Sequence, residues 1–231
     1  IKKSTRVYPF IRFNQQKKVH NKVIEIESIS KSYDEISVIN KFSTIINSGD
    51  RIAIIGENGI GKTTFLKCLV EDEFINEGTV KWSENALVGY FPQNPSNEFK
   101  SNISLLDWMN QWSHEEDDLE TVRGTLGRLL FSQNDIDKPI SVLSGGEQRR
   151  MLFGKIILQR ANVIILDEPT NHLDMESIES LNHALNLFEG TSIFVSHDRE
   201  FISSLATRLI EIKPDKIIDY DDNYNNYISK K

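Results

Sequence analysis

The stretch Gly56-Glu57-Asn58-Gly59-Ile60-Gly61-Lys62-Thr63 decides the fold of this chain. It matches G-x-x-x-x-G-K-[ST] and lies between the apolar run Ile52–Ile55 and the helical pattern of Thr63–Val70. Glycines let such a loop wrap closely enough for backbone N–H groups and the positive end of the next helix to point at phosphate oxygens. In this pattern Lys62 bridges the β and γ phosphates, and the Thr63 hydroxyl binds Mg²⁺. The context favours a phosphate-binding loop, which includes Thr64, over a ligand-free Gly-rich turn.

The arrangement of apolar runs around this loop predicts an α/β fold. Ile52–Ile55, Val163–Leu166 and Ile193–Val195 are continuously apolar, which is typical of strands buried on both faces of a parallel sheet. Helical periodicity follows in Gly146–Gln159 and Ser177–Phe188, so strands and helices alternate as in a doubly wound core. Half-exposed strands are expected in three further places: 23–27, Phe42–Ile46 and Thr79–Trp82.

A change of composition between Asn94 and Val142 predicts an inserted helical lobe. The segment is rich in Leu, Trp, Asn and acidic residues and poor in β-branched ones. Its acidic run Glu115–Asp118 is interpreted as a solvated tip, because adjacent like charges usually face water rather than bind a metal ion.

Two carboxylates follow the strand Val163–Leu166, namely Asp167 and Glu168. In enzymes with this type of phosphate loop, the first carboxylate holds Mg²⁺, usually through water, and the second can polarise the attacking water. The pair therefore predicts hydrolysis, with Glu168 as catalytic base. Taken alone, two solvated carboxylates at a strand end would be an equally good interpretation.

Charge and cysteine content narrow the class of protein. The net charge of the chain is −7. Residues 1–20 carry six basic side chains and no acidic one, so the net charge of residues 21–231 is −13. A body this acidic should repel nucleic acid and confine any RNA contact to the basic arm or to parts outside this sequence. The single Cys68 lies in an apolar stretch and cannot form an internal disulfide, which favours a core position in a cytoplasmic protein. The short apolar runs predict no membrane insertion.

The segment Leu143-Ser144-Gly145-Gly146-Glu147-Gln148 adds a second potential anion site. A serine and two glycines at a helix start expose a hydroxyl, N–H groups and a helix dipole, although such a segment is more often an ordinary N-cap. Because the loop ending at Lys62 already binds one set of phosphates, this site would serve another nucleotide. In sequence and order, the segment resembles the signature of ABC ATPases.

This resemblance implies functions for several other positions. Tyr33 resembles the aromatic residue that stacks on adenine, and Gln93 resembles the Q-loop glutamine that contacts Mg²⁺ and the attacking water. Asp174 resembles the D-loop aspartate at the contact between two domains, and His197 resembles the histidine that donates to the γ-phosphate. In such proteins ATP is sandwiched between two domains, so Ser144, Gly145, Gly146 and Glu147 would close over the nucleotide of the opposing domain. His20, His114 and His183 match no motif and are expected to be structural.

The same resemblance implies the architecture. It comprises a RecA-like parallel-sheet core, an antiparallel β subdomain and an inserted helical subdomain at about 94–155. Residues 21–231 would form the ATPase domain, and residues 1–20, with Pro9–Phe13, resemble the end of an interdomain linker.

The resemblance to the ABC-F subfamily rests on two motifs, Leu143–Gln148 and Asn171-His172-Leu173-Asp174. A resemblance to the YbiT-type members of that subfamily rests on the stretches Trp82–Ala86, Gly124–Gln133 and Asn223–Tyr227. These are cytoplasmic proteins with two fused ATPase domains that act at the ribosome near tRNA. The implied partners are a first ABC domain in the same protein, the ribosome and tRNA, and the isolated domain could form an ATP-dependent homodimer. Asp222 departs from the glycine usual in the tail. The ATPase subunit of a membrane transporter is the main alternative, and a P-loop kinase or GTPase is a third.

Overall fold

The computed structural model describes residues 8–230 and divides into two compact units. Unit 1 contains residues 8–14, 94–160 and 170–188, and unit 2 contains residues 15–93, 161–169 and 189–230. The elements of unit 2 are β1 (Lys22–Tyr33), β2 (Ile36–Asn47), β3 (Arg51–Ile55), α1 (Lys62–Leu69), β4 (Glu77–Trp82), β5 (Val88–Phe91), β6 (Val163–Asp167), β7 (Thr191–Val195), α6 (Arg199–Leu205), β8 (Arg208–Ile212), β9 (Ile217–Tyr220) and α7 (Tyr224–Ser229). Those of unit 1 are η1 (Ser96–Phe99), α2 (Leu105–Asn110), α3 (Leu119–Arg128), η2 (Ile140–Val142), α4 (Gly145–Leu158) and α5 (Met175–Leu187).

A six-stranded sheet in the order β5-β6-β7-β3-β8-β9 forms the centre of unit 2. Its strands pair in parallel except for β9, which runs antiparallel to β8. Every residue of β6 and β7 is buried, which explains their continuously apolar sequences. The three buried strands expected from the sequence are therefore present, and β5, β8 and β9 complete the sheet.

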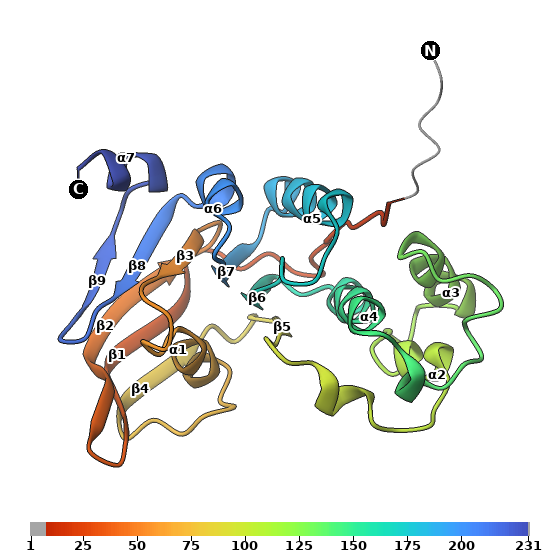
Figure 1. Cartoon of the computed structure of the whole chain (residues 1–231), viewed down its shortest axis with the longest axis horizontal. Helices are drawn as coiled ribbons and strands as arrows, with labels where there is room; N and C mark the ends of the chain where they lie inside the picture. The colour runs from red at the N-terminus through yellow and green to blue at the C-terminus, as the bar shows by residue number, and fades with distance from the viewer. Residues whose placement is uncertain (1–7, 231) are drawn as a thin grey trace. The chain divides into compact units, whose positions relative to one another are not determined.

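A second sheet, in the order β2-β1-β4, is antiparallel. Figure 1 shows the strands of both sheets and α1. Their apolar faces share one hydrophobic core, in which the rings of Phe42 and Phe65 meet edge to face with centroids 5.7 Å apart. Arg208 on β8 connects the sheets, because its guanidinium binds Asp50 at 2.9 Å and the Thr44 hydroxyl at 2.8 Å. The α/β fold with a parallel and an antiparallel sheet is thus confirmed.

Unit 1 is built around the contacts of α2, α3 and α4. Gly154 on α4 lets the helices approach closely, since an added Cβ would lie 2.8 Å from Leu129 and closer still to Met109. The acidic run is less solvated than expected. The Asp117 side chain is only 5% exposed and forms an ion pair with Arg160, which also binds Glu116 at 2.8 Å.

The end of the basic arm is ordered against α5. Ser180 donates a hydrogen bond to the carbonyl of Pro9 at 2.6 Å, and Phe13 contacts Phe188 at 6.1 Å between ring centroids. Tyr8 and Phe10 are 58% and 50% exposed. Within residues 8–14, the Tyr8 and Phe10 side chains therefore face solvent, whereas Ile11 and Phe13 are buried. Lys2, Lys3 and Arg6 lie outside the described residues.

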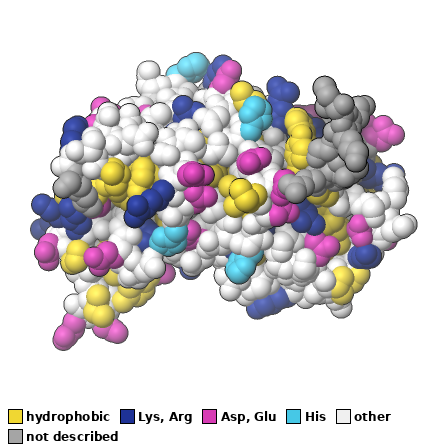
Figure 2. Space-filling view, turned by 45° about the horizontal axis from the view of Figure 1, so that its top comes forward, with side chains coloured by type: hydrophobic (Ala, Val, Ile, Leu, Met, Phe, Trp, Pro, Cys, Tyr) yellow, Lys and Arg dark blue, Asp and Glu magenta, His cyan; other side chains and the backbone are white. Residues whose placement is uncertain are grey.

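The surface and the single cysteine agree with the composition. Figure 2 shows acidic and basic side chains interspersed over the face drawn there. Among residues 8–230, no helix is long and apolar enough to cross a membrane. Cys68 is 2% exposed and burial raises its pKa to about 11, so it is an unreactive core residue, as expected.

Candidate active site

The loop between β3 and α1 can only be built with glycine at two of its positions. Gly56 has φ 147° and Gly61 has φ 111°, a backbone region that residues with a Cβ rarely adopt. A Cβ at position 56 would lie 2.5 Å from the carbonyl oxygen of Ile212, and one at position 61 would collide with Val38. The loop therefore wraps tightly between β8 and β2.

Lys62, the first residue of α1, lies inside this loop. Its ammonium group donates to the carbonyl of Gly56 at 2.9 Å and to that of Glu57 at 2.8 Å, and the residue is 7% exposed. Burial lowers the pKa of Lys62, while the charges of Glu168 and Asp167 oppose that shift. The loop thus holds a cation at its centre, which suits the phosphates of a nucleotide.

Adjacent parallel strands bring the predicted base and the predicted histidine together. Asp167, the last residue of β6, pairs with Val195 of β7, and the Glu168 N–H donates to the Val195 carbonyl at 3.0 Å. His197 then lies two residues beyond Val195, with its Nε2 2.9 Å from the Glu168 Oε1. Glu168 also has φ 51°, a value that is uncommon for residues with a Cβ.

The electrostatics of Glu168 suit a proton acceptor. The residue is 2% exposed, and burial is the largest cause of the raised pKa of its carboxyl group. The charge of His197 opposes the rise most strongly, Asp167 adds to it, and Lys62 also opposes it. A base whose pKa is moved toward the operating pH is more effective in proton transfer.

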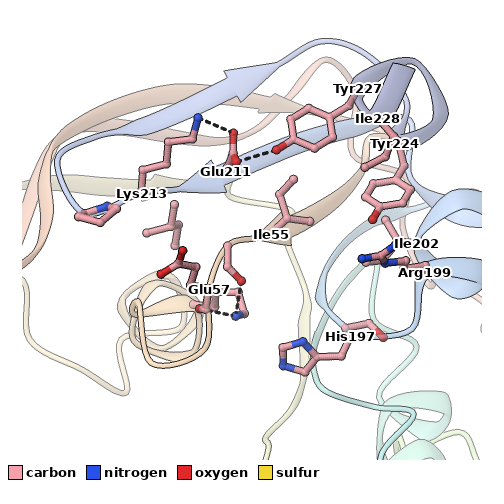
Figure 3. Close-up of a pocket in the computed structure, with 15 residues that line it drawn as sticks. Ile55, Glu57, His197, Arg199, Ile202, Glu211, Lys213, Tyr224, Tyr227 and Ile228 are labelled. Atoms are coloured by element: carbon pink, nitrogen blue, oxygen red, sulfur yellow. Dashed lines mark hydrogen bonds and ion pairs between the residues drawn. The ribbon is translucent and has the colours of Figure 1, made fainter. Parts of the chain in front are cut away.

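A cavity of about 610 Å³ opens between the phosphate loop and the carboxyl end of the sheet (Figure 3). Glu57 and Lys62 line it on the loop side, and Ser196 and His197 on the β7 side. Its far wall contains residues that the sequence analysis did not single out: Arg199, Glu211, Lys213, Tyr224 and Tyr227.

Glu211 could have been noticed as an acidic residue inside the apolar run 209–212. It is 5% exposed and accepts hydrogen bonds from the hydroxyls of Tyr227 at 2.6 Å and Tyr220 at 3.0 Å. These contacts attach α7 and β9 to the strand whose next residue, Ile212, lies against Gly56.

The oxygen donors predicted for Mg²⁺ lie on three elements of unit 2. Asp167 is fully buried at the end of β6, and Thr63 is half-buried in the first turn of α1, with Thr64 beside it. Gln93 is exposed two residues after β5, which pairs with β6 in parallel. In the described part of the chain, no three His, Cys, Asp or Glu side chains form a metal-binding cluster. A hydroxyl, an amide and a carboxylate suit a hard cation whose other ligands are phosphate or water oxygens.

Tyr33 ends the first strand of the β1–β2 hairpin and is 42% exposed. Its ring is therefore accessible to a ligand.

The predicted signature belongs to unit 1, where it begins α4. The Ser144 hydroxyl accepts from the Glu147 N–H at 3.4 Å and donates to the Glu147 carboxylate at 2.6 Å, while the Ser144 N–H donates to the same carboxylate at 2.8 Å. This is a complete capping box, so Ser144 does serve as an N-cap. Ser144 and Gly145 are exposed and Gly146 is half-buried, which leaves the helix start accessible.

Asp174 is the N-cap of α5. Its carboxylate accepts from the Ser177 N–H at 2.7 Å, and hydrogen bonds from Ser177 lower the pKa of Asp174. The aspartate expected at a domain contact therefore also stabilises a helix.

Comparison with known families identifies the fold that carries this site. The sequence pattern of the ABC transporter family matches residues 39–171, more than half of the chain. The chain belongs to the ABC ATPase family. It is consequently an ATP-binding domain of the ABC ATPase type, as the sequence predicted.

Similar proteins support the finer resemblance to the ABC-F subfamily. The ABC ATPase domain is 53% identical over its whole length to the "Probable ATP-binding protein YbiT" of Escherichia coli O157:H7, of which it covers 44%. It is 40% identical over 99% of its length to the "Uncharacterized ABC transporter ATP-binding protein YkpA" of Bacillus subtilis (strain 168), of which it covers 42%. It is also 36% identical over 95% of its length to "ABC transporter F family member 5" of Arabidopsis thaliana, of which it covers 32%. The chain thus spans less than half the length of these relatives.

Solved structures share the fold of the domain at low sequence identity. A bacterial Atm1-family ABC exporter with ATP bound superposes with a TM-score of 0.75 at 15% identity, covering 94% of this chain and 41% of the exporter chain. An inward-facing, putative metal-chelate type ABC transporter gives a TM-score of 0.68 at 21% identity, with 87% and 84% covered.

Proposed function

We propose that this chain is the second ATPase domain of an ABC-F-type, ribosome-associated translation factor. The observation that carries the ATPase part is the contact of 2.9 Å between Glu168 and His197, close to the loop that surrounds Lys62. In the proposed reaction, water attacks the γ-phosphorus, the bond to the β–γ bridging oxygen breaks, and the Glu168 carboxylate accepts the proton of the water. His197 donates a hydrogen bond to a γ-phosphate oxygen, and Lys62 balances the charge on the β and γ phosphates.

The remaining nucleotide contacts are assigned to residues of unit 2. Backbone N–H groups of Gly56–Gly61 and the start of α1 surround the phosphates, and the Tyr33 ring stacks on adenine. Thr63, Gln93 and Asp167 would hold Mg²⁺, which would neutralise charge on the phosphates. Buried or half-buried oxygen donors at Thr63 and Asp167 support this assignment.

The signature is proposed to act on a different nucleotide. Ser144, Gly145, Gly146 and Glu147 would contact the ATP that an opposing ABC domain holds, and Asp174 would lie at the domain contact. The opposing domain would be the first ABC domain of the same protein. Relatives more than twice as long as this chain leave room for such a domain. An ATP-dependent homodimer of the isolated domain would use the same contacts.

Residues 1–20 are proposed to be the end of the interdomain linker, with residues 21–231 as the ATPase domain and about 94–155 as its helical subdomain. The outward aromatic side chains of Tyr8 and Phe10, next to the exposed Arg12, support a position close to RNA. The ATP-driven closing of two domains would then act as a switch at the ribosome near tRNA, in the cytoplasm.

Co-sedimentation with ribosomes tests this function. The full-length protein with Glu168→Gln should bind ATP, fail to hydrolyse it and remain with ribosomes, and its binding should weaken as the salt concentration rises. The control is Glu35→Gln, which makes the same chemical change at an exposed residue. This variant should hydrolyse ATP normally and remain with ribosomes less than the Glu168→Gln variant does. Absence of ribosome binding, with recovery of a membrane protein instead, would favour a transporter subunit.

Turnover by a Ser144→Arg variant tests the shared nucleotide. An arginine at this position should block closure over the opposing ATP and stop hydrolysis by the two-domain protein. Undiminished turnover would contradict the proposed sandwich and favour a P-loop kinase or GTPase.

A further inference from the structure

One face of the Tyr33 ring is covered by a cation. The ammonium of Lys31 lies 4.5 Å from the centre of the ring, within the range of a cation–π contact. Both residues belong to β1, whose pairing with β2 shifts register between Lys31 and Ser32. A ligand ring can therefore stack only on the opposite face of Tyr33.

Glu73 holds the Lys31 ammonium in this position. Their charged atoms are 2.7 Å apart, and the Lys31 side chain is only 7% exposed. A hydrogen bond from Lys31, followed by one from Tyr33, lowers the pKa of Glu73. The Glu73 carboxylate thus binds the same ammonium group that lies over the Tyr33 ring.

The loop that carries Glu73 is itself attached to β1. Ser32 donates its N–H to the Asn76 side chain at 2.8 Å, and the Asn76 N–H donates to the Ser30 carbonyl at 2.8 Å. This loop directly follows α1, the helix that begins with Lys62. The position of the Tyr33 ring is therefore linked to the helix that would bind the phosphates.

We propose that Lys31 and Glu73 are positioning residues for the base of the nucleotide, an inference that rests on the proposed stacking of adenine on Tyr33. The faces of an aromatic ring carry negative charge and disfavour face-to-face stacking on an electron-rich purine. A cation behind the ring offsets that charge, and the ion pair with Glu73 fixes the position of the cation. The pair accordingly strengthens binding of the base without touching it.

The competing explanation is that the pair only stabilises the hairpin. The two explanations differ in the ligand affected, because a base-positioning pair matters for ATP but not for inorganic triphosphate, which lacks a base. A pair needed only for folding would alter both affinities together.

Calorimetric titration of the chain with Mg-ATP and with Mg-triphosphate provides the test. Lys31→Met should weaken ATP binding about threefold to tenfold, as expected for a contact of this type, and leave triphosphate binding unchanged. Lys31→Arg, which keeps the cation, should retain most of the ATP affinity. Lys22→Met is the matched control, because Lys22 forms an exposed 2.7 Å pair with Glu25 on the same strand, and neither affinity should change.

The outcomes separate this inference from the proposed function. If Tyr33→Ala leaves ATP affinity unchanged, the stacking assignment itself fails. If Tyr33→Ala weakens ATP binding but Lys31→Met does not, or if Lys31→Met weakens both ligands equally, only the positioning inference is overturned. Should Lys31→Met fail to fold, Lys31→Met combined with Glu73→Met, which leaves no unpaired charge, is held to the same criteria.

Discussion

Replacing Glu168 by glutamine should stabilise the folded protein at neutral pH and at the same time stop ATP turnover. The carboxylate is 2% exposed, and its raised pKa shows that burial and the charge of Asp167 outweigh the attraction of His197 and Lys62. The His197 side chain is 55% exposed, so water screens its contribution. Glutamine has the same shape but carries a neutral amide, so the variant avoids the free-energy cost of burying a charged carboxylate.

The expected gain is about 0.5–2 kcal/mol in the free energy of unfolding, typical of relieving a strained functional site. For a chain of this length that corresponds to roughly 2–4 °C in Tm per kcal/mol. Hydrolysis should fall about 10²- to 10⁴-fold, because a general base is lost.

The stability gained by Glu168→Gln should increase as the pH rises. The folded-state pKa of Glu168 is raised, so below its unfolded value of about 4.3 both states are protonated and the wild-type carboxyl carries no penalty. As the pH rises through the folded-state pKa, the wild type loses stability relative to the variant. The difference in Tm should therefore be absent in acid and grow toward neutral pH.

Thermal unfolding followed by circular dichroism without nucleotide, at several pH values, measures this difference. Glu35→Gln is the matched control, since Glu35 is exposed and its replacement should change stability by at most about 0.5 kcal/mol. A variant that melts below the wild type at neutral pH, or a gain independent of pH, would refute the argument.

Three further substitutions test a helix cap, the phosphate loop and a buried side-chain amide. Ser144→Ala removes the capping box with Glu147 and should cost about 1 kcal/mol, seen as a lower Tm of the chain. Gly61→Ala should weaken ATP binding at least tenfold, because its Cβ would collide with Val38 at a backbone angle that alanine disfavours, and titration with ATP would detect it. Asn162→Ala should lower the free energy of unfolding by about 2–4 kcal/mol in urea titration, because the 2% exposed amide makes three hydrogen bonds to backbone groups.

The sequence by itself determined the class of fold and the ATPase family. The continuous apolar runs at β3, β6 and β7 are typical of strands buried on both faces, so they predict a parallel sheet. The phosphate-loop motif is expected between a strand and a helix, which is where it lies in the sequence. The signature spelling then identified the family, because its motifs occur in a fixed order along the chain. Local patterns of this kind need no knowledge of distant contacts.

Tertiary structure alone decided which side chains meet. Glu168 and His197 are 29 positions apart, and only the pairing of β6 with β7 brings them to 2.9 Å. The same holds for Glu211 with Tyr227 and for Lys31 with Glu73, whose charged or hydroxyl groups come from separate elements. Such contacts depend on the order of the strands and the path of the loops, which the periodicity of a sequence does not reveal. Burial of an apolar run and the need for glycine in a tight loop, in contrast, can be predicted from the local sequence.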